Sequence, residues 1–202
     1  MAIKNFAGSL VKFILAICIF PISLAVVLNF PGHLSEYPNT LNEYFLGGVG
    51  IFLVVYLFIY KTWNFFDFGQ RMMETLFQFM APLNKAVART IPFYVTLIFV
   101  ITFVVRFFFN TESYNHIFAF LFGLASIMHV ILVSKEYQGE DKDSIKPAYL
   151  FGMQLILIFH VFYLTLGMDL AFGESTVGDL FKTVWKAAEY FYERFLPTSF
   201  RG

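Results

Sequence analysis

Four polar side chains interrupt long apolar runs of this chain, and they are the first candidates for chemistry. They are Arg106, His129, Gln154 and His160. Polar and ionisable residues at membrane depth are rare and commonly mark a bound ligand, a proton relay or a transport path. Imidazoles bind metals and haem, and a glutamine amide can hydrogen-bond across helices. We therefore treat these four residues as a candidate intramembrane polar cluster.

The first pairing that the spacing favours joins His129 to Gln154. Counted from the ends that share a connecting loop, His129 lies five residues into the fourth apolar run and Gln154 six residues into the fifth. Antiparallel neighbours would hold both at one depth. The simplest interpretation is an interhelical polar clamp that contributes about 1 kcal/mol.

A haem held by His129 and His160 is disfavoured by the same count. Bis-histidine ligation requires two facing imidazoles at one level. His160 lies twelve residues into its run, so the expected offset from His129 is about 10 Å at 1.5 Å per residue. Arg106, near the far end of the third run, is expected to reach the interface or to pair with Glu112, Asp169 or Glu174.

The elements that must position these residues are membrane helices. The 202-residue chain is 58% hydrophobic, only 14% charged and has a net charge of zero, whereas soluble domains carry about 25% charged residues. The charge balance gives no reason to expect nucleic acid as a partner. The single cysteine, Cys18, lies in an apolar run and is interpreted as a packing residue. We predict an all-α bundle of five spans, at 11–30, 44–60, 91–109, 117–134 and 148–172.

Two amphipathic segments accompany the spans. The pattern of 61–90 predicts an amphipathic helix at the membrane surface that ends at Pro82. The prolines, glycine and asparagines of 31–43 predict a loop. Residues 1–174 would form the bundle, followed by an amphipathic helix and tail at 175–202. Ser175 or Thr176 could cap this last helix, which suits the membrane interface and a docking partner equally well.

Lysine and arginine set the expected orientation. They are concentrated near the N-terminus and in 61–90 and 135–147, and are absent from 31–43 and 110–116. The positive-inside rule then predicts a cytoplasmic N-terminus in a bacterial inner membrane. Five spans would place the C-terminal helix outside, where its basic residues run against the rule, so an additional half-span stays open.

One pattern resembles a known family. The motifs "FFDFGQRMMETLFQFM", "RTIPFYVTLIF" and "FAFLFGLASIMHVILVSKEYQGEDKDSIKPAYLFGMQLILIF" follow an apolar span in an order similar to the small M50-like, site-2-protease-like membrane proteins. The resemblance implies that Gln70, Arg71 and Glu74 occupy the positions of that family's zinc-binding His, general-base Glu and second His. Zinc hydrolysis needs two imidazoles one turn apart and a carboxylate. The resemblance therefore implies a non-catalytic relative.

The function expected from the sequence is a non-catalytic membrane subunit or scaffold without a cofactor. Its partners would be the lipid bilayer and either other membrane proteins or further copies of itself, bound through the glycine-bearing second span, the Phe-rich faces and the C-terminal helix. No H-E-x-x-H, G-x-S-x-G or phosphate-binding glycine motif is present. Two alternatives stay open, namely a transporter or channel component with a polar path at His129, Gln154 and His160, and a haem b-type anchor subunit.

Overall fold

The computed structural model describes residues 2–58, 63–81, 83–109, 114–140 and 147–195 as an all-α chain, and none of these residues forms a strand. This confirms the predicted fold class. The elements are α1 (Ala2–Leu34), α2 (Asn39–Phe58), α3 (Trp63–Leu76), the 3₁₀ turn η1 (Gln78–Met80), α4 (Asn84–Thr90), α5 (Phe93–Phe108), α6 (Asn115–Glu140), α7 (Pro147–Phe172) and α8 (Val177–Phe195).

Four described helices are long and apolar enough to cross a membrane. They are Gly8–Leu34 of α1, α2, Asn115–Gln138 of α6, and α7. The helices α4 and α5 pass the same test only together, and they meet at a 65° bend. Alone, the 16 residues of α5 extend about 24 Å, short of the ~30 Å hydrocarbon core. The chain is therefore a multi-pass membrane protein with four spans, or five if the bent pair counts as one.

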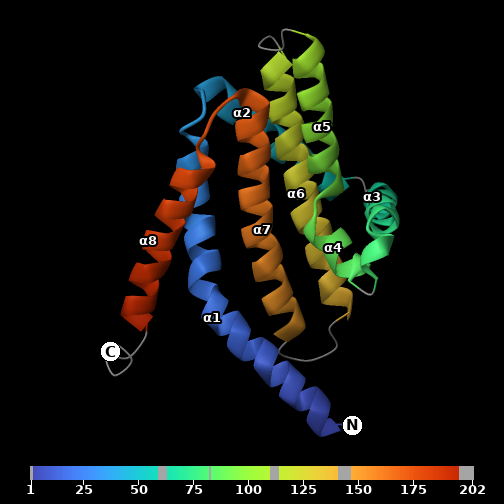
Figure 1. Cartoon of the computed structure of the whole chain (residues 1–202), viewed down its shortest axis with the longest axis vertical. Helices are drawn as coiled ribbons and strands as arrows, with labels where there is room; N and C mark the ends of the chain where they lie inside the picture. The colour runs from blue at the N-terminus through green and yellow to red at the C-terminus, as the bar shows by residue number, and fades with distance from the viewer. Residues whose placement is uncertain (1, 59–62, 82, 110–113, 141–146, 196–202) are drawn as a thin grey trace.

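Several helices extend beyond their predicted ends. The predicted loop 31–43 is mostly helical, because α1 continues through Pro21 and Pro31 to Leu34 and α2 begins at Asn39. Helix α1 is visibly bent in Figure 1, as expected for a helix that contains proline. Helix α6 likewise continues six residues past Ser134, since Lys, Glu and Gln in that stretch favour helix.

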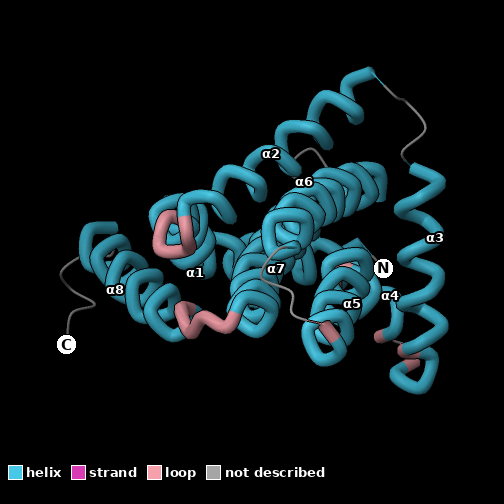
Figure 2. The backbone as a smooth tube through the Cα atoms, turned by 90° about the horizontal axis from the view of Figure 1, so that it is seen from above, coloured by secondary structure: helices cyan, strands magenta, loops and turns pink. Residues whose placement is uncertain are grey.

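The predicted surface helix at 61–90 is instead three short elements. Helix α3 ends at Leu76, η1 follows, and α4 begins at Asn84. The proline expected to end the helix, Pro82, lies outside the described residues. Figure 2 shows α3 at the edge of the bundle, on the side away from α8.

The spans pack in a continuous order. Helix α8 lies on α1, α1 on α7, α7 on α6 and α6 on α2, while α5 contacts both α6 and α7. The closest of these contacts joins α2 to α6. A Cβ atom on Gly48 would lie 2.0 Å from the carbonyl oxygen of Phe120, and one on Gly123 would lie 2.0 Å from that of Phe45. The small residues of span two thus permit backbone contact, as predicted, but within this chain.

Candidate functional site: a buried imidazole pair and the polar groups around it

The two intramembrane histidines lie against each other at the α6–α7 interface. Their ring centroids are 5.3 Å apart and the ring planes differ by 12°. His129 is 5% exposed and His160 is 2% exposed. The expected offset of about 10 Å was wrong because α6 extends to Glu140. His129 is therefore eleven residues from the end of α6, close to the thirteen residues that separate His160 from the start of α7.

Most of the nitrogen atoms in this imidazole pair have no hydrogen-bond partner. One ring nitrogen of His129 donates to the backbone carbonyl of Arg89, while Nε2 of His129 and both ring nitrogens of His160 are buried and unpartnered. The hydroxyl of Ser126, one turn from His129 on α6, is also buried without a partner. Such groups are rare in native proteins because each lost hydrogen bond costs about 1–3 kcal/mol.

The predicted clamp between His129 and Gln154 does not form. No hydrogen bond joins them, and Oε1 of Gln154 is buried without a partner. Gln154 precedes His160 by six residues on α7, about 9 Å along the helix axis. The packing register that brings the two histidines together therefore separates Gln154 from His129.

A second polar group lies where α3, α4 and α6 meet. Gln70 donates a hydrogen bond of 2.7 Å to one carboxylate oxygen of Glu136, and Arg89 contacts the other at 2.7 Å. The Arg89 guanidinium also lies 5.0 Å from the centre of the Tyr137 ring. A small cavity with room for about one water molecule has Gln70 of this group and His129 of the imidazole pair among its lining residues.

The positions that the family resemblance singles out hold no zinc-type arrangement. Gln70 is engaged with Glu136, and Arg71 is exposed on α3. Glu74 lies one turn beyond Gln70 on the same helix and is half-buried. Among the described residues, no group of three or more His, Cys, Asp or Glu side chains is placed to hold a metal ion.

An apolar groove opens beside the imidazole pair, between α2 and α5 with α6 as its floor. Its volume is about 350 Å³. All of its lining residues but Tyr94 are hydrocarbon or methionine side chains: Phe52, Val55, Phe65, Ile98, Leu121, Leu124, Ala125 and Met128. The hydroxyl of Tyr94 is engaged, since it donates to the carbonyl of Phe65. The groove therefore suits an apolar chain or an apolar helix face.

Near the C-terminal end of α7, Asp169 organises a polar cluster that was not predicted from the sequence. Its carboxylate accepts hydrogen bonds from Tyr37 Oη (2.6 Å), Thr176 Oγ1 (2.7 Å), Thr176 N (2.7 Å) and Val177 N (2.8 Å). His33 contacts Thr176 Oγ1 at 3.1 Å. Burial, with the neighbouring Asp169, raises the pKa of Tyr37. The first backbone N–H of α8 is thus capped by Asp169 of α7, rather than by Ser175 or Thr176.

Arg106 belongs to this end of the molecule and not to the imidazole pair. Its guanidinium donates to the carbonyls of Ala171 (2.7 Å) and Leu170 (3.5 Å) at the end of α7. Gly173 follows with φ of +81°, where a Cβ atom would lie 2.8 Å from Arg106. Arg106 therefore binds helix-terminal carbonyls. It forms no ion pair with Asp169 or Glu174, and Glu112 lies outside the described residues.

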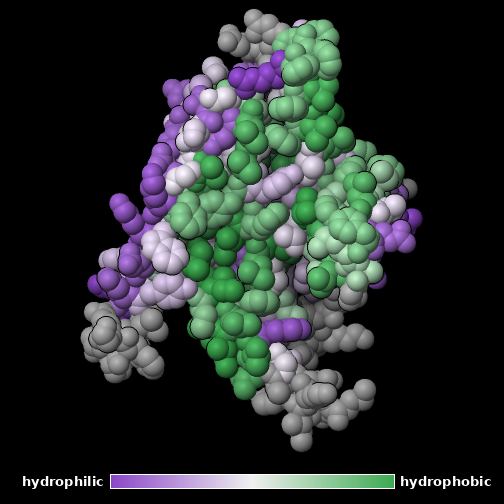
Figure 3. Space-filling view, viewed as in Figure 1, coloured by the Kyte–Doolittle hydropathy of each residue, from purple (hydrophilic) through white to green (hydrophobic). Residues whose placement is uncertain are grey.

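Helix α8 has a buried face and an exposed face, so its amphipathic pattern is confirmed in part. Phe181 and Trp185, which follow the same helical spacing as the buried apolar residues, are exposed. Leu180, Val184 and Ala188 are 1–3% exposed and pack against Ala25 and Val26 of α1. The opposite face carries exposed charged side chains, which are Asp179, Lys182, Lys186, Glu189, Glu193 and Arg194. Figure 3 shows these hydrophilic residues along one edge of an otherwise largely hydrophobic surface.

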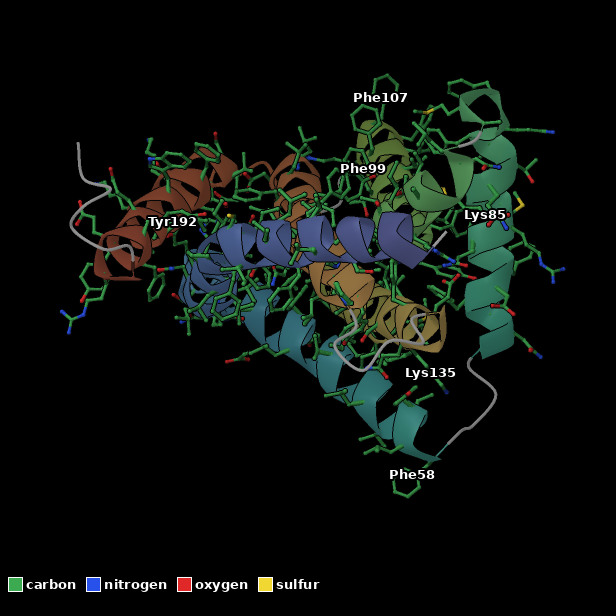
Figure 4. All side chains as sticks on the ribbon, turned by 90° about the horizontal axis from the view of Figure 1, so that it is seen from below. Phe58, Lys85, Phe99, Phe107, Lys135 and Tyr192 are labelled. Carbon is green, nitrogen blue, oxygen red and sulfur yellow. The ribbon has the colours of Figure 1, made fainter. Side chains whose placement is uncertain are left out.

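The direction of α8 differs from the expectation for a helix outside the membrane. At its start Thr176 contacts His33, near the end of α1, and at its other end the Tyr192 hydroxyl donates to the carbonyl of Cys18. Figure 4 shows Tyr192 where α8 meets α1. Helix α8 therefore returns along α1 toward the end of the bundle at which the chain begins.

Comparison of the chain with protein-family models, curated proteins and solved structures found no match.

Proposed function

We propose that this chain is a non-catalytic subunit of a membrane-protein complex and that the charged face of α8 is its main contact with a partner protein. The observation that carries the proposal is the position of this charged face beside a membrane span. Between His33 and Cys18, α8 accompanies fifteen residues of α1, or about 22 Å of a hydrocarbon core of ~30 Å.

The depth of the charges makes contact with lipid unfavourable. Lys182 and Lys186 follow Thr176 by six and ten residues, which corresponds to about 9 and 15 Å along the axis from the start of α8. A lysine at the centre of a span costs about 2.5–3.5 kcal/mol when it faces lipid. A protein surface with complementary polar groups removes most of this cost. The charged face of α8 is thus better explained as an interface than as a lipid-facing surface.

Release of α8 to the membrane surface is the main competing arrangement, and the polar cluster around Asp169 argues against it. Undocking would leave the buried carboxylate of Asp169 without three of its four donors and would expose the apolar contact with Ala25 and Val26. A buried charge that loses its partners costs several kcal/mol. Helix α8 is therefore held along α1 by the Asp169 cluster at its start and by its apolar contact with Ala25 and Val26.

The apolar groove between α2 and α5 gives a second surface for a partner. A groove of this volume with an apolar lining accommodates one face of a transmembrane helix. This use agrees with the hypothesis of a pseudo-protease. In that hypothesis the chain is similar to the M50-like proteins but has Gln70, Arg71 and Glu74 at the zinc-motif positions. It would therefore bind transmembrane helices without hydrolysing them. We further propose a bacterial inner-membrane location with the N-terminus in the cytoplasm. The returning α8 then brings Arg194 toward the cytoplasmic side, in agreement with the positive-inside rule.

Site-specific photocrosslinking in the cells that normally produce the protein tests the proposal. A photoreactive residue replaces Lys186 in one variant, and replaces Phe103, an exposed apolar residue of α5, in the matched control. We expect a discrete protein adduct from position 186 and none from position 103. An adduct of twice the chain's mass would identify a second copy as the partner, and an adduct of another mass a different protein.

Accessibility of Lys186→Cys to a membrane-impermeant thiol reagent, in a Cys18→Ser background, completes the test. An α8 that is covered by a partner is protected until the complex is dissociated. If position 186 reacts rapidly in intact membranes and forms no protein adduct, α8 lies in water and the proposal is wrong.

A further inference from the structure

We propose that His129 and His160 form a binding site for one Cu(I) ion. The proposal concerns a different region from the protein interface on α8 and does not depend on it. It rests on three unpartnered ring nitrogens in one pair, on the orientation of His129, and on the burial of both rings.

The hydrogen bond of His129 resembles that of a metal ligand. A metal-bound histidine usually donates its second ring N–H to a carboxylate or a backbone carbonyl, which fixes the tautomer and the ring orientation. His129 donates to the carbonyl of Arg89, and its Nε2 is left buried without a partner. The nitrogen that would bind the ion is therefore the unprotonated one.

The separation of the rings is compatible with one shared ion. A metal–nitrogen bond of about 2.0 Å on each side of an ion places two in-line imidazole centroids roughly 6 Å apart, and a bent arrangement places them closer. The observed distance between centroids is 5.3 Å. The rings are stacked, so their in-plane lone pairs do not converge in this arrangement. No hydrogen bond holds His160, and binding of the ion requires its ring to turn about the Cβ–Cγ bond until one nitrogen faces Nε2 of His129.

The number and type of donors select the ion. Zinc prefers four ligands, but no third His, Cys, Asp or Glu side chain joins this pair among the described residues. Cu(I) accepts two nitrogen donors in a near-linear arrangement. The desolvation penalty of an ion rises with the square of its charge, so a monovalent ion enters this buried site at about one quarter of the penalty of a divalent one. Phe66, whose ring centre lies 6.2 Å from that of His129, is one of the apolar groups that limit further coordination.

Competition titration on the purified full-length protein in detergent tests the site. The protein carries Cys18→Ser, because the exposed thiol of Cys18 would bind Cu(I) itself. Cu(I) is supplied with ascorbate under nitrogen, against bicinchoninate as the coloured competitor. We expect one ion bound per chain. X-ray absorption of the complex should show two nitrogen neighbours and no sulfur.

Three variants locate the ion. His160→Leu and His129→Gln should each lower the affinity at least a hundredfold, whereas His116→Gln, which changes a histidine next to Tyr44 at the other end of α6, should bind as the parent does. Thermal unfolding without metal verifies that each variant is folded. Ag(I), a redox-inert ion with the same preference for two donors, should raise the melting temperature of the parent and not that of His160→Leu.

The proposal fails if the parent binds less than 0.1 ion per chain. It also fails if folded His160→Leu and His129→Gln retain the affinity of the parent, or if absorption shows sulfur ligands, because the ion then lies elsewhere. Stoichiometric binding of Zn²⁺ in preference to Cu(I) would overturn the choice of ion and, with it, the two-donor site.

Discussion

Two buried polar regions lie at different levels of α7 and satisfy their hydrogen bonds in opposite ways. Around Asp169, both carboxylate oxygens accept hydrogen bonds, and the donors come from the α1–α2 connection and from the start of α8. Around His160, three ring nitrogens and a serine hydroxyl have no partner. A satisfied buried network holds elements together, whereas unsatisfied groups reduce stability and are kept where they serve a ligand. The Asp169 cluster is therefore a structural joint, and the imidazole pair is the better candidate for binding.

The largest difference between the two regions should come from removing their central side chains. Asp169→Ala leaves several buried donors unpaired and should lower the free energy of unfolding by about 3–5 kcal/mol. Denaturant titration in detergent measures this loss. Glu174→Gln, at a nearby exposed position, is the matched control and should change little. Equal stability of Asp169→Ala and the parent would show that the cluster is not a structural joint.

Removal of one donor from the same cluster should have a smaller effect that depends on pH. Tyr37→Phe deletes the hydroxyl that donates to Asp169 and should cost about 1.5–3 kcal/mol near pH 7. Burial raises the pKa of Tyr37 in the folded chain, so the folded state holds this proton more firmly than the unfolded state, whose pKa is about 10. The stability that Tyr37 contributes is therefore present below pH 10 and falls above it.

Melting curves of the parent and of Tyr37→Phe between pH 8 and 11 measure this dependence. The difference between the two should shrink as the pH rises. A difference that stays constant up to pH 11 would contradict the role of Asp169 and burial in holding the Tyr37 proton.

The imidazole pair should respond in the opposite direction. His160→Leu replaces a buried ring that has two unpartnered nitrogens with an apolar side chain of similar volume. Without metal, the free energy of unfolding should stay the same or rise by about 1 kcal/mol. The same denaturant titration measures it, with His33→Leu as the contrast, since His33 contacts Thr176 and its loss should destabilise. A loss of 2 kcal/mol or more in His160→Leu would show that His160 has partners in the protein.

The smallest expected effect is at Ser126, whose hydroxyl is buried without a partner one turn from His129. Ser126→Ala should raise the free energy of unfolding by at most about 0.5 kcal/mol. Thr165→Ala provides the comparison, because the Thr165 hydroxyl donates to the carbonyl of Val161 at 2.9 Å. Differential melting of the two variants distinguishes them. If Ser126→Ala destabilises the protein more than Thr165→Ala does, the Ser126 hydroxyl has a hydrogen-bond partner. It would then not belong with the unsatisfied groups around His160.

Much of the architecture was predictable because it depends on local pattern. The scarcity of charge and the length of the apolar runs led to an all-α membrane bundle. The helical spacing of the apolar residues after Ser175 predicted a buried face for α8, which holds for Leu180, Val184 and Ala188 but not for Phe181 and Trp185, which are exposed. The helix ends were less predictable. Neither the prolines of α1 nor the charged residues after Ser134 stop a helix that neighbouring helices support.

The candidate site was only partly predictable, because it depends on where the helices end. The count that separated His129 from His160 and paired His129 with Gln154 relied on α6 ending at Ser134. Because α6 extends six residues further, His129 lies six residues deeper from the loop than the count assumed. This depth matches that of His160 and not that of Gln154. Asp169 was considered only as a partner for Arg106. Its carboxylate caps the start of α8, seven positions further along the chain, and also accepts a hydrogen bond from Tyr37, 132 positions away. No local pattern contains that information.

By itself, the sequence determined that the solvent of most of this chain is lipid, that its elements are helices and which residues are costly to bury, because these follow from residue type and short-range periodicity. Only the tertiary structure decided which costly residues meet. It brought His129 to His160, Arg106 to the end of α7, and Asp169 to the start of α8, and it returned the charged face of α8 along α1. Contacts between distant segments depend on helix register and crossing direction, where a shift of a few residues changes every neighbour.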